Sequence, residues 1–365
     1  MVYRVIGLMS GSSLDGLDIA FVELEEIGGK WTYSIIGADC IPYSEEWRHK
    51  LQNAPSLSAA VFVELDAAYG HLTADLVNRF IADNKIEYKV ALVVSHGHTV
   101  FHVPGSYSIQ MGDGAAIAAI TGLPVVSHLR SMDVALGGQG APIVPMGEKL
   151  LFPEYRFFLN IGGIANISFN GDAGYNAFDV CAANRVLNML VNPVGLDFDH
   201  NGHLAATGRI NEPLLEKLNA LDYYNQPFPK SLANEFGTGI VFPMIASAGL
   251  SPEDSLATYV EHIAFQVSAS VSAIMEHQSL AITGESLLVT GGGALNSYLV
   301  SRIRQHLAVL GIEVVLPDEV TIMYKEALIM ALLGVLRWRE EDTVMASVTG
   351  ASRSSIGGAL WMGAH

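Results

Sequence analysis

Three glycine-bearing turns in this 365-residue chain have the composition of anion-binding loops. Each directly follows a segment expected to be a strand: Ser10 to Gly16, Gly162 with Gly163, and Gly291 to Gly293. Without side chains in the way, backbone N–H groups can converge on an anion, and the hydroxyls of Ser12 and Ser13 add further donors. Together the three turns predict a site for a nucleotide polyphosphate. No Walker A pattern and no G-x-G-x-x-G fingerprint follows a strand, which disfavours P-loop and Rossmann folds.

Asp179 is the candidate catalytic residue. We expect it on a turn at the end of a strand, after Tyr175 to Phe178 and before a helix that starts near Asn184. Burial beside Phe178 and Val180 can raise the pKa of a carboxyl so that it acts as a general base. The alternative is an aspartate that closes a turn or caps the helix.

Histidines and an arginine supply further polar groups. His96, His98 and His102 alternate along an expected strand end, so they share a face as metal ligands would. No cysteine or clear carboxylate ligand accompanies them, and we therefore predict no metal site there but polar residues that line a cleft or bind a loop. Arg130 and Asp133 form either a surface ion pair or, through Arg130, a bidentate clamp on a substrate carboxylate.

Two similar hairpins must position these groups. Residues 3–9 and 17–24 predict a strand, a loop and a returning strand, and residues 155–161 and 164–169 repeat that pattern about 150 residues later. The repeated pattern predicts two related lobes, each of which begins with a β-hairpin. The alternative is that the similarity of the two hairpins is a coincidence.

The remaining pattern alternates strands with helices, which predicts α/β architecture. Expected strands are 90–94, 124–126, 287–289 and 312–315, and expected helices are 57–84, 113–121, 260–274, 295–310 and 325–336. The stretch from Ser127 to Pro145 is rich in Gly and Pro and is the expected linker.

Composition narrows the class of protein. Hydrophobic residues make up 50% and charged residues 16%, which excludes disorder, and the net charge of -17 makes nucleic acids and anionic membranes unsuitable partners. Two cysteines cannot build a disulfide framework, and the apolar run 327–336 is too short for a bilayer. With no visible export signal, we expect a cytoplasmic protein, and its hydrophobic content is compatible with a homodimer.

Six motifs, in order along the chain, resemble those of the anhydro-N-acetylmuramic acid kinase family. They are Gly7 to Asp18, Ser95 to Thr99, Gln110 to Gly114, Gly137 to Pro142, Asn160 to Asn166, and Thr290 to Ala294. The resemblance implies two related α/β lobes of the actin-like ATPase (ribonuclease H-like) type, with an interlobe active-site cleft. We expect an N-terminal lobe over 1–130, onto which 345–365 packs back, and a C-terminal lobe over 131–344.

The resemblance also implies the reaction. ATP, with Mg²⁺, phosphorylates O6 of 1,6-anhydro-N-acetylmuramic acid as water opens the anhydro bridge, a step of cell-wall recycling. By motif position Asp179 is the base that activates water, while His98, Arg130 and Asn184 lie at the sugar, with Arg130 near its lactyl carboxylate. The implied ATP-binding residues are Gly11, Ser12, Ser13, Leu14, Asp15, Gly16, Leu17, Asp18, Gly162, Gly163, Gly291, Gly292 and Gly293.

The sequence departs from the family beside the base. The family run Phe-Asp-Thr-Gly-Pro-Gly-Asn is here Phe178 and Asp179, then Val180 to Ala183, then Asn184. Loss of two glycines and a proline changes the φ angles open to this loop. The alternatives are therefore a nucleotide-binding module with a decayed sugar site, or a kinase for a related sugar. Whether Asp15 or Asp18 orients Mg²⁺ stays open.

Overall fold

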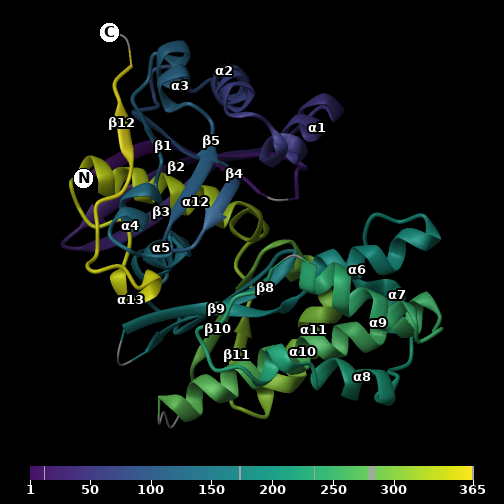
Figure 1. The fold of residues 1–365 in the computed structure, drawn as a ribbon. Helices are drawn as coiled ribbons and strands as arrows, with labels where there is room; N and C mark the ends of the chain where they lie inside the picture. Colours follow the sequence, from purple (N-terminus) through teal and green to yellow (C-terminus); the bar gives the residue numbers. More distant parts are fainter. Residues whose placement is uncertain (12, 172–173, 234, 279–283, 364–365) are drawn as a thin grey trace. The chain divides into compact units, whose positions relative to one another are not determined.

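The chain forms two compact units, which we describe separately. The computed structural model describes residues 1–11, 13–171, 174–233, 235–278 and 284–363. Unit 1 comprises Met1–Pro153 and Tyr324–His365, and unit 2 comprises Glu154–Met323 (Figure 1). These bounds differ from the expected lobes, because residues 131–153 and 324–344 belong to unit 1. The glycine- and proline-rich stretch expected to be a linker lies inside unit 1.

Unit 1 is built on a mixed sheet of seven strands. Its order is β12-β6-β4-β1-β2-β3, with β5 paired to β4; β1 runs parallel to β4 and antiparallel to β2. The strands are β1 (Val2–Ser10), β2 (Gly16–Ile27), β3 (Lys30–Pro42), β4 (Leu92–Val103), β5 (Tyr107–Met111), β6 (Val125–Ser127) and β12 (Ala359–Trp361). Because β12 pairs with β6, the C-terminal residues complete this sheet.

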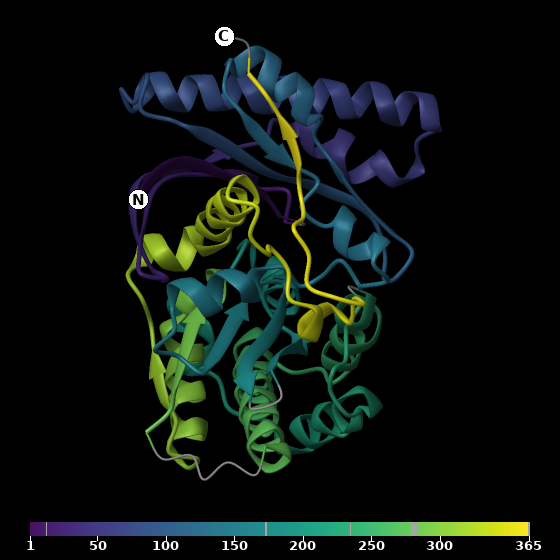
Figure 2. The same ribbon diagram turned by 90° about the vertical axis from the view of Figure 1, so that its left-hand side faces the viewer.

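Helices cover both faces of the unit 1 sheet (Figure 2). Ile6 and Leu8 of β1 pack into a core with α2, whereas Gly7 between them faces the opposite side. A Cβ on Gly7 would lie 1.9 Å from the carbonyl oxygen of Ala327, so glycine lets α12 approach β1 closely. The helices are α1 (Glu45–Asn53), α2 (Ala59–Asp83), α3 (Gly114–Thr121), α4 (Ser131–Ala135), α5 (Val144–Leu151), α12 (Glu319–Trp338) and α13 (Ala346–Thr349).

Unit 2 repeats the same strand order. Its five strands run β11-β10-β7-β8-β9, in which β7 pairs antiparallel with β8 and parallel with β10, as β1 does with β2 and β4. The strands are β7 (Phe157–Ile161), β8 (Ile164–Gly171), β9 (Gly174–Ala182), β10 (Ser286–Thr290) and β11 (Glu313–Val315). This repetition confirms the prediction of two related α/β lobes.

One apolar core holds the helices of unit 2 against its sheet. Phe157, Leu159 and Ile161 of β7 pack against the apolar side of α10 and against α6 and α11. The helices are α6 (Asn184–Val191), α7 (His203–Thr207), α8 (Glu212–Asn219), α9 (Phe242–Ala246), α10 (Pro252–His277) and α11 (Ser297–Ala308). Among the described residues, no helix has both the length and the apolar character needed to cross a bilayer.

Candidate active site

The first glycine-bearing turn joins β1 to β2 in unit 1. Ser13 donates a hydrogen bond from Oγ to the carboxylate of Asp15, and Leu14 adopts a φ of 61°. Gly16 is required by packing, since a Cβ there would lie 2.5 Å from the carbonyl oxygen of Ile41. Leu17 is buried at the start of β2. Ser12 lies outside the described residues.

Asp18 ends this motif on β2, where it faces Cys40 of β3. Burial raises the pKa of Asp18 to about 6, the bond with Cys40 opposes that change, and the negative charges of Asp15 and Glu326 add to it. Burial likewise raises the pKa of the Cys40 thiol to about 12. Because carboxylates repel one another here, the loop end is suited to a cation.

His98 lies on β4 beside Ser10, the last residue of β1, within a chain of hydroxyl groups. Its Nδ1 is 3.0 Å from Oγ of Ser10, which accepts a hydrogen bond of 2.8 Å from the hydroxyl of Tyr43, and Tyr43 contacts the hydroxyl of Tyr69 at 2.6 Å. Burial lowers the pKa of His98 to about 4, so the ring is neutral at pH 7. Of the three histidines expected at a strand end, His96 and His98 lie inside β4, whereas His102 is the last residue but one of this strand, which ends at Val103.

Arg130 is held rigidly by two partners. Its Nε and Nη2 lie 3.0 and 2.8 Å from Nε2 of His96, and Nη1 donates to the carbonyl oxygen of Gly140 at 2.7 Å. Burial and the charge of Arg130 lower the pKa of His96 to about 3, so its Nε2 accepts and its Nδ1–H donates to Gly97. Burial lowers the pKa of Arg130 itself to about 10, which still leaves it charged at pH 7.

The alternative of a surface ion pair between Arg130 and Asp133 is wrong. Asp133 is 1% exposed, and its carboxylate accepts hydrogen bonds from the N–H of Gly140 at 2.7 Å and the hydroxyl of Thr349 at 2.6 Å. Asp133 therefore shapes the glycine-rich loop whose Gly140 carbonyl binds Arg130.

Glu326 on α12 is a candidate that the sequence analysis missed. Its negative charge acts on both Asp18 and Arg130, and burial raises its own pKa. In the sequence, Lys325 and Glu326 serve only as the polar boundary of an apolar run. A pair of charges at the start of a buried helix was the available signal, because buried charges need partners.

The second and third glycine turns meet in unit 2. The N–H groups of Ala183 and Asn184 donate to the carbonyls of Gly163 and Gly162, at 2.9 and 3.1 Å. Asn184 also donates from Nδ2 to the carbonyl of Ile161 at 3.1 Å. The turn from Gly291 to Gly293 reaches the same place, since a Cβ on Gly293 would lie 3.0 Å from Oδ1 of Asn184.

Two kinds of glycine make up the predicted phosphate-binding set. Gly16, Gly291 and Gly293 are required by packing, with an added Cβ 2.2–2.6 Å from a neighbouring atom. In contrast, an added Cβ would meet nothing closer than 3.4 Å at Gly11, Gly162, Gly163 and Gly292. The backbone of these four glycines is therefore open. Neither packing nor a positive φ requires glycine at these positions, whereas a ligand that approaches the backbone would require it.

Asp179 lies on β9 rather than on the expected turn, since the strand continues to Ala182. A register shift in the pairing with β8 sets Asp179 opposite Asn166 and Cys181 opposite Ala165, which leaves Val180 as a bulge. Burial raises the pKa of Asp179, while hydrogen bonds from Leu232 and Ser231 oppose that change. A partly desolvated carboxylate of this kind can act as a general base.

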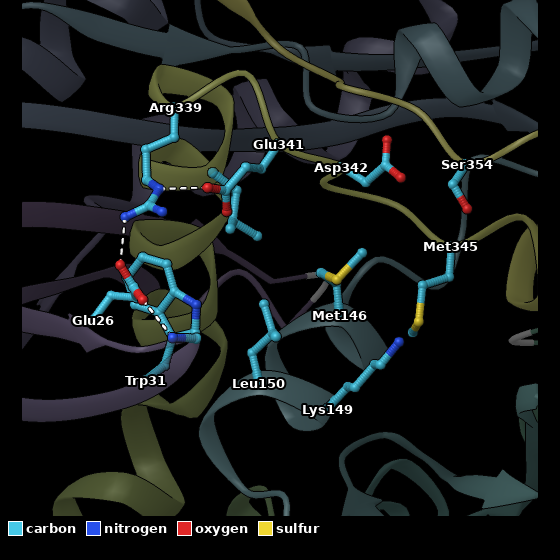
Figure 3. Close-up of a pocket in the computed structure, with 12 residues that line it drawn as sticks. Glu26, Trp31, Met146, Lys149, Leu150, Arg339, Glu341, Asp342, Met345 and Ser354 are labelled. Atoms are coloured by element: carbon cyan, nitrogen blue, oxygen red, sulfur yellow. Dashed lines mark hydrogen bonds and ion pairs between the residues drawn. The ribbon is translucent and has the colours of Figure 1, made fainter.

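A cavity of about 420 Å³ in unit 1 contains none of the predicted site residues. Figure 3 shows Arg339 on one side of it, ion-paired to Glu26 and Glu341, and Met345 with Ser354 on the other. The guanidinium also stacks on Trp31, 5.4 Å from the ring centre. These contacts tie the end of α12 to the β2–β3 hairpin.

Comparison with known proteins establishes the family. The family profile described as anhydro-N-acetylmuramic acid kinase matches residues 3–363. The chain belongs to the anhydro-N-acetylmuramic acid kinase family. It is 32% identical to the anhydro-N-acetylmuramic acid kinase of Photobacterium profundum, over 99% of both chains. It is 33% identical to that of Synechococcus elongatus, over 97% of this chain and 98% of the relative. The chain is therefore an enzyme of the sugar-kinase class, and the resemblance carried by the six motifs is confirmed.

Solved structures give a more distant similarity. An activator of 2-hydroxyisocaproyl-CoA dehydratase from Clostridium difficile shares 16% identity with a TM-score of 0.48, over 92% of this chain and 96% of that chain. Component A of (R)-2-hydroxyglutaryl-CoA dehydratase from Acidaminococcus fermentans shares 14% identity with a TM-score of 0.46, over 90% of this chain and 96% of that chain.

Proposed function

We propose that this member of the anhydro-N-acetylmuramic acid kinase family uses ATP to convert 1,6-anhydro-N-acetylmuramic acid into N-acetylmuramic acid 6-phosphate. Asp179 takes a proton from water as the water oxygen bonds to C1 of the sugar. The bond from C1 to the bridging O6 breaks, and O6 takes the γ-phosphoryl group, with ADP as the other product. Water is a poor nucleophile and needs a base. Cleavage of the bond at C1 is the same reaction step that glycosidases catalyse, and they usually do so with a positioned carboxylate.

The observation that carries this proposal is the state of Asp179. Asp179 is partly buried on β9, and burial raises the pKa of its carboxyl above that of an exposed aspartate. Neither a turn-closing residue nor a helix cap fits it, because it lies within β9, and the residue that precedes α6 is Ala183.

The glycine-bearing turns with open backbone are assigned to ATP binding. We assign the γ- and β-phosphates to the N–H groups from Gly11 to Asp18, with Gly162 and Gly163 as further phosphate contacts and Gly291 to Gly293 at the adenosine. Phosphoryl transfer depends on positioning and charge neutralisation more than on covalent chemistry, so backbone donors suit it.

Mg²⁺ fits the carboxylates at the end of the first loop. Asp15 and Glu326 both raise the pKa of Asp18 by charge repulsion, a strain that a bound cation would relieve. We assign Asp18 and Asp15 as the residues that would hold Mg²⁺. The ion would neutralise charge that develops on the phosphates.

Arg130 is assigned to the lactyl carboxylate of the sugar, with His98 and Asn184 as further sugar contacts. His96 and Gly140 fix the plane of the guanidinium, and a fixed plane is what bidentate binding of a carboxylate needs. Neutral His98 can donate or accept without adding charge.

Asp179→Asn tests the assignment of the base. We expect the variant to bind Mg-ATP normally in calorimetry and to lose about 10²–10⁴ in kcat. Asp197→Asn, which changes an exposed aspartate of the same unit, is the matched control and should keep full activity. Undiminished phosphorylation by Asp179→Asn would contradict the proposal.

The substrate is tested separately with the purified chain. ADP released only when the anhydro sugar is present supports the kinase, whereas ATP binding without turnover supports a module with a decayed sugar site. Equal rates on the anhydro sugar and on reducing N-acetylmuramic acid would show that the bridge is not required.

A further inference from the structure

Residues 223–232, which we call the clasp segment, hold Asp179 at both its main chain and its carboxylate. The Tyr223 hydroxyl donates to the Asp179 carbonyl at 2.6 Å, and the Asp179 N–H donates to the carbonyl of Lys230 at 3.0 Å. At the carboxylate, Oδ2 accepts from the N–H of Leu232 at 2.8 Å and from Oγ of Ser231 at 3.2 Å. Four hydrogen bonds therefore join this one segment to Asp179, three donated by the segment and one donated by Asp179.

The clasp segment is itself held in shape. Nζ of Lys230 donates to the carbonyls of Tyr223 and Tyr224, at 3.1 and 3.2 Å, and lies 4.7 Å from the centre of the Tyr223 ring. Phe228 stacks on Phe178, with ring centres 5.1 Å apart and planes 10° from parallel. The segment is thus closed by Lys230 and anchored on the strand that carries Asp179.

The strand alone does not fix the carboxylate. The bulge at Val180 interrupts the pairing of β9 with β8 directly after Asp179, where a bulge can change the direction of a side chain. From Val180 to Ala183 there is no glycine and no proline to set the backbone. Hydrogen bonds from outside the strand must supply the missing constraint.

We propose that the clasp segment is a positioning device for the general base, with Tyr223 and Ser231 as its positioning residues. This inference rests on the proposed role of Asp179. Both hydrogen bonds to the carboxylate end on Oδ2, and no described residue donates one to Oδ1. Oδ1 is therefore the oxygen left to take the proton from water, and the bonds to Oδ2 and to the main chain keep it in one orientation. Small displacements of a catalytic group are costly, by up to about 10²-fold for a shift of 1 Å.

Two variants test the clasp while they keep the fold. Tyr223→Phe removes one hydroxyl and keeps the ring, and it should lower kcat by about 10-fold with ATP affinity unchanged. Ser231→Ala removes a donor from an exposed side chain and should move the acid limb of the kcat–pH profile to higher pH, because a hydrogen bond that favours the charged carboxylate is lost. Ser231→Thr keeps the hydroxyl and should restore the profile.

Ser247→Ala is the matched control. Ser247 is exposed in the same unit and donates to the carbonyl of Met244, so its loss should leave kcat and the pH profile unchanged. Unchanged kcat in Tyr223→Phe together with an unmoved acid limb in Ser231→Ala, in a protein that Asp179→Asn inactivates, would overturn the clasp alone. An active Asp179→Asn would instead contradict the base assignment on which the clasp rests.

Discussion

Nε2 of His96 accepts hydrogen bonds from two N–H groups of Arg130, at 3.0 and 2.8 Å. A histidine that accepts from a cation must be neutral, which agrees with a pKa of about 3 for His96. The pair sets the orientation of the guanidinium, and the carbonyl of Gly140 fixes it from the other side.

Arg130→Lys should therefore weaken sugar binding although it keeps the charge. An ammonium cannot bind His96 and Gly140 and also present a planar pair of donors to a carboxylate. We expect KM for the anhydro sugar to rise about 10-fold or more, with a smaller change in kcat. Arg337→Lys, which changes a unit 1 arginine bonded to the Gly358 carbonyl, is the control. An equal loss of affinity for an anhydro sugar that lacks the lactyl group would contradict the role of Arg130.

The pKa of Asp18 predicts a stability that depends on pH. In the folded chain the pKa is about 6, above the ordinary aspartate value of 3.8, so the contribution of this carboxyl to stability is fully present below pH 4 and is lost as the pH rises through 6. Asp18→Asn removes that penalty and should stabilise the nucleotide-free protein at pH 8, on the order of 1–3 kcal/mol, with little change at pH 4. Thermal unfolding at both pH values measures this effect. Asp39→Asn, at an exposed carboxylate on β3, is the control, and an Asp18→Asn variant with the same change in Tm at both pH values would refute the prediction.

The buried ion pair between Lys325 and Glu148 predicts that loss of one partner destabilises the protein more than loss of both. Nζ and Oε1 lie 2.9 Å apart, and the two side chains are 2% and 4% exposed. Lys325→Met leaves the Glu148 charge buried without its ammonium and should cost about 3–5 kcal/mol of unfolding free energy. Adding Glu148→Leu should recover most of that loss in urea denaturation. Lys50→Ala, at an exposed pair on α1, should cost less than about 1 kcal/mol.

The sequence predicted those parts of the fold that have a strong hydrophobic pattern. The two hairpins and helix α2 appear close to their expected ranges, because apolar periodicity reports directly on which face is buried. The long helices α10 and α12 were also predicted, but both begin earlier and end later than the expected 260–274 and 325–336. β3 was not predicted. It is an edge strand whose side chains are mostly exposed or only partly buried, so its pattern resembles that of a loop.

The candidate site was predictable only in part. Motif positions drew attention to Asp179 and Arg130, but the partners that hold them lie far away in sequence. Leu232 is 53 residues from Asp179, and His96 is 34 residues from Arg130. A single sequence carries no signal for such hydrogen bonds, because they depend on how strands and loops come together in the fold.

The two kinds of glycine in unit 2 predict opposite outcomes for the same substitution. Gly293→Ala brings a Cβ within 2.2 Å of the Ile161 side chain, so it should destabilise the protein by about 1–3 kcal/mol. Gly163→Ala brings a Cβ no closer than 3.7 Å to any atom, so Tm should stay the same, whereas the affinity for Mg-ATP should fall because the methyl group covers the open backbone. Gly239 lies outside the predicted site, and an added Cβ there would meet nothing within 4 Å. Gly239→Ala should therefore alter neither property. Tm and calorimetric ATP affinity, measured on all three variants, separate packing from ligand binding. Normal ATP affinity in Gly163→Ala would show that the open backbone at this turn is not a phosphate contact.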